Sequence, residues 1–260
     1  MPVRSGASRR RLLLGGAIVL ALSVLRPAAP APALASSRLP AIMLWAWERP
    51  SDLRSIADDA GVAFLAQTVT IDRDRVTIAS RRWPLKVNPA TMLSAVTRIE
   101  MPVTRALDDE EGRVAQAIAD TARFPGVAAV QIDFDAVESQ RAFYRRLIRD
   151  VRGRIDARVP LSITALASWC VGDRWLDGLP VDEAVPMLFQ LGPLNEPYRS
   201  VALAPDAAHP LCRSSLGTSL DEPMTLRRSG RRVYVFNPDT WTQPTIEHAQ
   251  RYARGEGVMP

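Results

Sequence analysis

Apolar residues recur along the chain in short runs that are separated by polar loops and, in several places, by helix-like stretches. Eight such runs follow residue 40, and most of them carry strand-forming residues. Nearly continuous apolar strands that alternate with helices are typical of a parallel sheet buried on both faces. The runs span residues 42–47, 62–71, 92–99, 127–135, 161–169, 184–191, 212–219 and 232–237, of which 212–219 is the weakest.

Two of the intervening segments have a clear helical pattern. Before the fourth run, Asp108 is the expected N-cap, Glu111 follows three residues later, and the helix is expected to end near Arg123. After the fourth run, apolar residues recur every four positions and arginines fall between them, which predicts a helix with one solvated face. The apolar positions are Phe143, Leu147, Val151 and Ile155, and the arginines are Arg141, Arg145, Arg149 and Arg152.

The count and order of these elements indicate one α/β domain. Eight strands with crossover helices predict a (β/α)8 barrel of the TIM type over residues 36–260. Residues 193–230 have an irregular pattern that is rich in proline and alanine, so the barrel is expected to be trimmed or irregular around strands six to eight. An open, doubly wound sheet is the alternative architecture.

The first 35 residues read as an export signal. They begin with basic residues, continue with an apolar stretch that is too short for a membrane span, and end in Ala33-Leu34-Ala35, a small-x-small cleavage site. Ser8, Arg9 and Arg10 fit the twin-arginine signal, and an ordinary secretory signal is the alternative. We therefore expect a periplasmic or secreted protein that keeps no stable membrane anchor after the signal is removed.

The net positive charge of the chain comes from the residues of this predicted signal. The chain has 33 basic and 28 acidic residues, and five of the arginines lie in the first 35 residues, where there is no acid. The remaining body is therefore formally neutral, which argues against nucleic acid as a partner. The oligomeric state is left open by the sequence.

The two cysteines, Cys170 and Cys212, leave two states open. In an exported protein they can form one disulfide, or they can remain unpaired. A nucleophilic cysteine would need a histidine base, and the chain has only His209 and His248. Cysteine catalysis is therefore the least favoured interpretation.

The fourth run ends in two aspartates that share one face of the strand. Gln131, Asp133 and Asp135 alternate with apolar residues, so their side chains point the same way, which in a barrel is the interior. Arg98 and Glu100 on the third strand are expected to face the same cavity. Arg98 is thus predicted to be a buried counter-ion, whose removal would cost about 3 to 5 kcal/mol. A purely structural ion network is the alternative.

Other strands add polar and aromatic residues near their carboxyl ends, where TIM barrels carry their chemistry. An indole ring stacks on the C–H face of a sugar, and amides and carboxylates bind its hydroxyls, so this combination favours a glycan or another polar small molecule as ligand. The candidate substrate-binding residues are Glu48, Arg98, Gln131, Trp169, Gln190, Asn237, Asp239 and Trp241.

At this point the residues resemble a known family. QIDFDAVE at residues 131–138 is similar to the fourth-strand motif D-G-x-D-x-D-x-E of chitinase-type family eighteen glycosidases. MLFQ at residues 187–190 resembles their strand-six motif M-x-Y-D, and Trp241 is placed like their tryptophan after strand eight. The resemblance implies a barrel that acts on glycans.

The sequence departs from this family at the proton donor. Asp133 and Asp135 match the two inner aspartates, but Val137 stands where the acid glutamate is expected, and Glu138 comes one place later. At the strand-six tyrosine and aspartate, the chain has Phe189 and Gln190. The identity of the acid is therefore left open by the resemblance.

Phrases spread over nearly the whole mature chain are similar to a second family, the domain of unknown function 3142 family of exported bacterial proteins. They include LWAWERP at residues 44–50, TALASWC at residues 164–170 and DEAVPMLF at residues 182–189. This family implies no activity. It adds weight only to the barrel and to a joint role for the strand-end residues.

Three functions are compatible with these residues. The first is glycoside hydrolysis with Asp133 and Asp135 as central carboxylates and Glu100, Glu48 or Glu138 as proton donor. The second is a barrel that binds a glycan or an envelope partner without hydrolysis. The third is a hydrolase whose metal is held by carboxylate oxygens. No nucleotide-binding or serine-esterase motif is present, so no cofactor is expected.

Overall fold

The structure is a computed structural model that describes Met1 and residues 39–72, 75–102, 111–192, 196–204, 208–226 and 230–256. The chain divides into two compact units, Met1–Pro32 and Ala33–Pro260. The expected export signal, its twin arginines and its cleavage site therefore lie outside the described residues.

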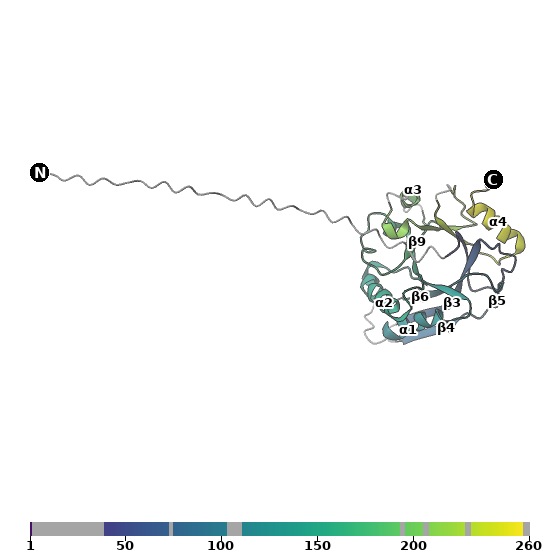
Figure 1. Cartoon of the computed structure of the whole chain (residues 1–260), viewed down its shortest axis with the longest axis horizontal. Helices are drawn as coiled ribbons and strands as arrows, with labels where there is room; N and C mark the ends of the chain where they lie inside the picture. The colour runs from purple at the N-terminus through teal and green to yellow at the C-terminus, as the bar shows by residue number, and fades with distance from the viewer. Residues whose placement is uncertain are drawn as a thin grey trace. The chain divides into compact units, whose positions relative to one another are not determined.

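Eight parallel strands form a closed barrel (Figure 1). The first strand pairs with the last strand on one side and with the second barrel strand on the other, which closes the ring. All eight expected strands are confirmed, including the weak one, and the open-sheet alternative is wrong. In spatial order the strands are β1 (Ile42–Ala46), β11 (Arg232–Phe236), β10 (Ser215–Ser219), β9 (Glu183–Met187), β8 (Leu161–Leu166), β7 (Val127–Asp133), β6 (Leu93–Glu100) and β3 (Ala60–Asp72).

The second barrel strand is followed by further strands. β3 continues past the ring to Asp72 and pairs antiparallel with β4 (Arg75–Ser80), a short segment in which Val76 and Thr77 are β-branched. A two-stranded pairing of β2 (Ser51–Asp52) with β5 (Leu85–Lys86) joins this excursion to the β1–β3 connection. Among the described residues, the connection after the second barrel strand therefore contains strands in place of a helix.

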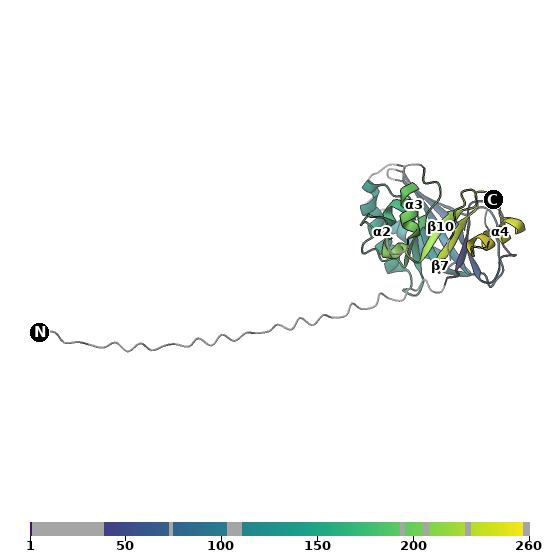
Figure 2. The ribbon, with the colours of Figure 1, turned by 90° about the horizontal axis from the view of Figure 1, so that it is seen from above.

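Among the described residues, α-helices follow only some of the strands. They are α1 (Glu111–Thr121), α2 (Arg141–Arg154), α3 (Glu196–Leu203) and α4 (Gln243–Ala253). The apolar stripe of α2 is buried as expected, whereas Asp108, the expected N-cap of α1, lies outside the described residues. Figures 1 and 2 show α2 and α4 on opposite sides of the barrel. No helix in the described part of the chain has the length and apolar character needed to span a bilayer.

A buried ion pair closes the amino end of the barrel. Glu183 and Arg232 are the first residues of β9 and β11, and their side chains are 1% and 9% exposed. One carboxylate oxygen accepts a hydrogen bond from Arg232 Nη1 at 2.6 Å, and the other accepts one from the Tyr234 hydroxyl at 2.7 Å. Each charge is therefore matched, as a buried charge requires.

The middle of the barrel is filled by an indole ring. Trp45 Nε1 donates to Gln131 Oε1 at 2.8 Å, and Gln131 Nε2 donates to Ser162 Oγ at 3.1 Å. The ring lies against Gly217, where a Cβ atom would come within 2.7 Å of Trp45 Cη2. Only a residue without a side chain leaves room for the indole at this position.

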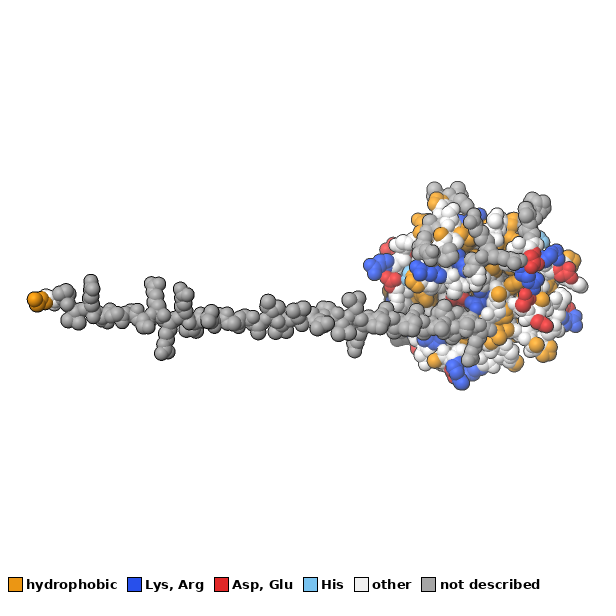
Figure 3. All heavy atoms as spheres, turned by 45° about the horizontal axis from the view of Figure 1, so that its top comes forward, with side chains coloured by type: hydrophobic (Ala, Val, Ile, Leu, Met, Phe, Trp, Pro, Cys, Tyr) orange, Lys and Arg blue, Asp and Glu red, His pale blue; other side chains and the backbone are white. Residues whose placement is uncertain are grey.

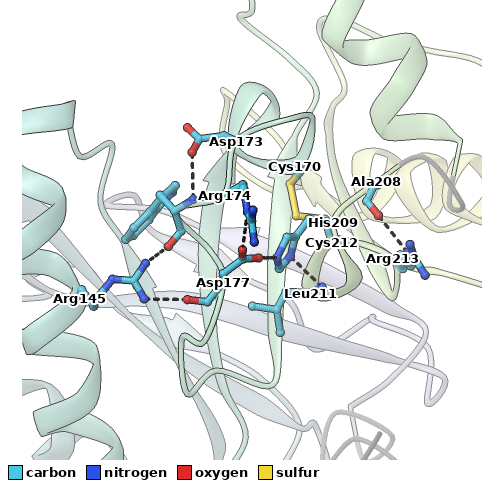
Figure 4. A network of polar contacts seen from close by, with 11 residues as sticks. Arg145, Cys170, Asp173, Arg174, Asp177, Ala208, His209, Leu211, Cys212 and Arg213 are labelled. Carbon is cyan, nitrogen blue, oxygen red and sulfur yellow. Dashed lines mark hydrogen bonds and ion pairs between the residues drawn. A yellow bond between two sulfur atoms is a disulfide. The ribbon is translucent and has the colours of Figure 1, made fainter. Parts of the chain in front are cut away.

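A disulfide joins two connections on the outside of the barrel. Cys170 ends the 3-10 helix η3 (Ala167–Cys170), Cys212 ends η4 (Pro210–Cys212), and their Cα atoms are 5.9 Å apart. Figure 4 shows the neighbouring His209 ring, whose Nε2 lies 3.0 Å from Asp177 Oδ1 and whose Nδ1 accepts the Leu211 N–H. Both cysteines are used in the bridge, so neither is a nucleophile.

Basic and acidic side chains lie next to one another over the face drawn in Figure 3. Many of the arginines on this molecule pair with nearby carboxylates, as Arg154 does with Asp150 on α2. This mixing agrees with the formally neutral body that the composition indicates.

Candidate functional site

A cavity of about 340 Å³ opens at the carboxyl ends of the barrel strands. Side chains from β1, β6, β7, β8, β9 and β11, together with the segments that follow the strands, form its walls. The carboxyl ends of parallel strands meet at one end of a TIM barrel, so polar residues distant in sequence converge there. The lining residues are Trp45, Trp47, Arg98, Asp133, Asp135, Thr164, Leu166, Ala167, Ser168, Met187, Phe189, Gln190, Leu191 and Phe236.

Asp133 is the last residue of β7 and is only 5% exposed. Thr164 Oγ1 donates to its Oδ1 at 2.8 Å, and Arg98 Nη1 lies 3.5 Å from its Oδ2. Burial, followed by the nearby charge of Asp135, raises the pKa of Asp133 to about 6, although Thr164 and Arg98 favour the charged form. The carboxyl group therefore takes up a proton at mildly acidic pH.

Asp135 lies two residues beyond Asp133, just past the end of β7, and its side chain reaches solvent at the cavity. The cavity walls still remove enough water to raise the pKa of Asp135, and the charge of Arg98 opposes this effect. The two carboxylates face one cavity, as the strand alternation predicts. We call Asp133 and Asp135 the aspartate pair.

Arg98 contacts the aspartate pair but is not the buried counter-ion that the sequence suggests. Its Nη1 is 3.5 Å from Asp133 and its Nε is 3.3 Å from Glu100, while 40% of its side chain is exposed. Water screens a group this open, and the guanidinium is shared between two carboxylates. We therefore correct the expected cost of its removal from about 3 to 5 kcal/mol to about 1 kcal/mol.

A second hollow of about 430 Å³ borders the same charged residues. Arg98 and the aspartate pair line both hollows, and Glu100 and Val137 line only the second. The side chain of Glu100 is half exposed and reaches the pair through Arg98. The aspartate pair therefore borders both hollows.

Three aromatic residues form one wall of the cavity, and a fourth forms its floor. The Phe189 and Phe236 rings stack with centroids 5.6 Å apart, and Trp47 meets Phe236 edge-on at 6.1 Å. Trp45 forms the floor, with its ring 6.3 Å from Phe189. We call Phe189, Phe236 and Trp47 the aromatic row.

Sequence reasoning overlooked Trp45, Trp47, Phe236 and Thr164 as site residues. Trp45 and Trp47 sit inside or just after an apolar run and look like core residues there. Their spacing of two places them on one side of β1, and this alternation is the signal that could have found them.

Several expected ligand contacts lie away from the cavity. Trp169 is 1% exposed and packs against Trp175 with ring centroids 5.0 Å apart, and Trp241 is 4% exposed with its Nε1 donating to the Trp45 carbonyl at 2.9 Å. Gln131 is completely buried below the cavity, where it orients Trp45. These three side chains contribute to packing in the structure and line neither hollow.

The remaining candidates lie near the rim or on the surface. Glu48 accepts a hydrogen bond from the Arg82 N–H at 2.9 Å, and Glu138 is exposed in η2 (Glu138–Gln140). Asn237 accepts the Asp239 N–H at 3.1 Å within a turn, and the Asp239 side chain is 87% exposed. All four lie outside the lining of the two hollows described above.

Gln190, in contrast, lines the cavity as expected. Its φ angle is 54°, and no other residue besides glycine has a positive φ in the described part of the chain. Its N–H donates to Glu222 Oε2 at 2.8 Å, which helps to hold this unfavourable backbone conformation.

The described carboxylates at the cavity are not grouped as metal ligands. Within the described ranges, no group of three or more histidine, cysteine, aspartate or glutamate residues is placed to hold an ion. Glu100 and the aspartate pair do not form such a group. The described residues therefore give no support to a metal-dependent hydrolase.

Comparisons with known proteins bear on the fold alone. Neither a family model nor a curated protein matches the chain, so membership of the domain of unknown function 3142 family stays a prediction. The spore cortex-lytic enzyme SleL of Bacillus cereus is 19% identical over 68% of this chain, with a TM-score of 0.47, and the chain spans 50% of that protein. The chitinase domain of the spore coat protein CotE of Clostridium difficile is 11% identical over 89% of this chain and 65% of that one, with a TM-score of 0.37.

A third solved structure is matched over almost its whole length. The chitinase-like lectin of tamarind is 9% identical over 84% of this chain and 99% of that one, with a TM-score of 0.50. At 9% identity the likeness concerns the course of the backbone alone. The chain therefore has a TIM-type barrel fold similar to that of a chitinase-like protein.

Proposed function

We propose that the protein is an exported carbohydrate-active barrel that binds a glycan and hydrolyses a glycosidic bond at the aspartate pair. The observation that carries this proposal is the position of two neighbouring carboxylates in a cavity with an aromatic wall. Sugar rings stack on aromatic rings through their C–H faces, and their hydroxyls bind carboxylates and amides. The chitinase-like fold agrees with a glycan ligand without identifying it.

The charges around the pair favour a particular class of glycan. Among the described residues that line the two hollows, Asp133, Asp135 and Glu100 are acidic and Arg98 is basic. An anionic sugar would meet a surplus of carboxylates there. Neutral or amine-bearing sugars are therefore the expected ligands.

The aspartate pair supplies the proton in the proposed reaction. Burial raises the pKa of both carboxyl groups, and the charge of Asp135 adds to the rise at Asp133, so the pair holds a proton below about pH 6. Asp135 reaches the open cavity and donates this proton to the glycosidic oxygen as the bond to the anomeric carbon breaks. Water then adds its oxygen to the anomeric carbon and returns a proton to the pair.

Asp133 has a different part in this scheme. Thr164 and Arg98 fix its position next to Asp135, so that once ionised it stabilises positive charge on the reacting sugar. Glu138 is not assigned as the donor because it lines neither hollow. Glu100 remains the alternative donor for a ligand that enters through the second hollow.

Export completes the proposal. Residues 1–35 act as the signal, and the Cys170–Cys212 bridge supports a destination outside the cytoplasm, because disulfides persist in oxidising compartments. The intact mass of the exported protein tests this part. A chain that starts near Ser36 is expected, and a chain that still contains Arg9 and Arg10 would contradict it.

Binding and turnover of chito-, gluco- and galacto-oligosaccharides test the function. Asp135→Asn is expected to abolish turnover and to leave binding within a few-fold of the wild type. Asp58→Asn is the matched control, because Asp58 is an exposed carboxylate in the turn before β3, at the opposite end of the barrel. It should change neither property.

The same experiment separates the hydrolase from a binding protein. Val137 stands where the chitinase-type glycosidases have their acid glutamate. This difference favours a non-catalytic barrel as the second candidate. Binding by the wild type without turnover at any pH from 4 to 8 would establish that candidate and refute hydrolysis. Absence of both binding and turnover for every sugar series would refute the glycan proposal itself.

A further inference from the structure

Trp83 is an exposed indole on a segment that no sequence pattern connects with the site. It lies between β4 and β5, and 47% of its surface is exposed, compared with 4% or less for Trp45, Trp169 and Trp241. A single exposed aromatic residue needs no special explanation. The contacts that hold this segment in place are what make Trp83 relevant to the cavity.

One arginine ties the Trp83 segment to the cavity rim. Arg81 Nε donates to the Trp83 carbonyl at 2.8 Å, and its Nη1 donates to the carbonyls of Trp47 at 2.6 Å and Ala46 at 3.0 Å. A single guanidinium thus bridges the backbone of Trp83 to that of Trp47, which lines the cavity. Its Nη2 also donates to the Arg49 carbonyl at 2.6 Å.

These hydrogen bonds hold the Trp83 segment in place. They form although burial of the Arg81 guanidinium costs hydration energy. Burial lowers the pKa of Arg81, so the guanidinium gives up part of its hydration in order to bind these carbonyls. A second link runs in parallel, because Glu48 accepts the Arg82 N–H at 2.9 Å. Two links, from Arg81 and Arg82, therefore fix the backbone that presents Trp83 to the end of β1.

The aromatic row leads from the cavity to this fixed segment. Phe189 stacks on Phe236, Phe236 meets Trp47, and the Trp47 carbonyl is held by the same arginine as the Trp83 carbonyl. A ligand that fills the cavity and extends along this row reaches the rim near Trp83. A rigid indole outside a cavity can stack on a further sugar ring with little loss of conformational freedom.

We infer that Trp83 is an outer stacking platform for an oligosaccharide chain whose inner end occupies the cavity. The inference rests on the proposed function and adds that the ligand is a chain of several sugar units rather than a single sugar. Glu48 and Arg82, which lie beside Trp83 in this arrangement, are placed to bind hydroxyls of the outer units. Glu48 thus acquires a role at the rim and not at the reacting bond.

Binding affinity as a function of chain length tests this inference. In the sugar series that the wild type binds, the hexasaccharide should bind more tightly than the disaccharide. Trp83→Ala should weaken hexasaccharide binding by about 3- to 10-fold and leave disaccharide binding unchanged. Trp83→Phe should restore most of the loss, because it keeps an aromatic face.

Phe124→Ala is the matched control. Phe124 is 41% exposed and lies between α1 and β7, at the amino end of the barrel, so its removal should leave every affinity unchanged. Equal affinity of the wild type and Trp83→Ala for the hexasaccharide would overturn the inference and leave the proposed function intact. A loss shared by disaccharide and hexasaccharide would also overturn it, because it would indicate a change in the cavity. If the wild type binds no sugar at all, the proposed function fails first.

Discussion

Asp133→Asn should stabilise the protein at neutral pH although it changes a residue that contacts Thr164 and Arg98 in the site. Burial and the charge of Asp135 raise the pKa of Asp133 from its ordinary 3.8 to about 6. This rise corresponds to a destabilisation on the order of 3 kcal/mol when the group is ionised in the folded protein. Because Asp133 is only 5% exposed, solvent screening does not remove this energy.

The sign of the pH dependence follows from the two protonation states. Below about pH 4 the carboxyl group is protonated in both the folded and the unfolded chain, and no penalty exists. Between about pH 4 and pH 6 the folded state holds the proton that the unfolded state has lost, so stability falls as pH rises. Above pH 6 the full penalty is present in the wild type and absent in the variant.

Urea denaturation from pH 4 to pH 8 measures this difference directly. The unfolding free energy of Asp133→Asn should exceed that of the wild type by roughly 2 to 3 kcal/mol at pH 7, and the two should converge at pH 4. The attraction to Arg98 is already contained in the net pKa of Asp133, so its loss is not subtracted again. The Asn oxygen can still accept the Thr164 hydrogen bond.

The opposite result would refute this reasoning. If Asp133→Asn is less stable than the wild type at pH 7, Asp133 belongs to a structural network in which its charge is needed. The control Asp58→Asn should follow the wild type at every pH, because that carboxylate is exposed. Its agreement with the wild type would assign the pH-dependent difference to the buried position.

Two further substitutions probe the barrel that supports the site. Gly217→Ala would place a Cβ atom 2.7 Å from the Trp45 ring, so thermal unfolding should show a loss of about 1 to 3 kcal/mol together with weaker ligand binding, whereas an unchanged melting temperature would mean that the indole can move aside. Glu183→Gln would leave the buried Arg232 without its carboxylate and should cost about 3 to 5 kcal/mol in urea denaturation, whereas a loss below about 1 kcal/mol would indicate that water reaches the guanidinium.

The strands could be predicted because the barrel buries both of their faces. A run such as residues 127–133 is apolar enough to stand out whichever face is considered, and its alternation identifies the interior side. The weak run is buried along all five residues of β10, but its serines, threonine and glycine hide that burial from a hydrophobicity pattern.

The excursion after β3 could not be predicted from the same signals. The barrel pattern leads one to expect a helix after every strand, whereas β4 is held by its antiparallel pairing with the part of β3 that projects beyond the ring. That pairing depends on contacts between strands, which local periodicity does not report. The segment that carries Trp83 follows β4, so it was overlooked for the same reason.

The site was predictable where strand alternation still applied and not beyond it. Asp133 and Arg98 lie within strands, and both face the cavity as their alternation indicates. Trp169 follows the end of β8 at Leu166 and belongs to the 3-10 helix η3, so strand alternation no longer fixes its direction. Its indole packs against Trp175 in the hydrophobic core instead of lining the cavity.

The two ends of the barrel differ in how their charged side chains are paired. At the amino end, Glu183 is paired with Arg232 at 2.6 Å, which satisfies both charges and supports the fold. At the carboxyl end, the aspartate pair shares a single arginine of the described lining, and this arginine also serves Glu100. A chain that needed only stability could match its charges at both ends. Burial raises the pKa of both carboxyl groups, and the ionised pair destabilises the fold, which is the arrangement expected if the pair serves the ligand proposed above.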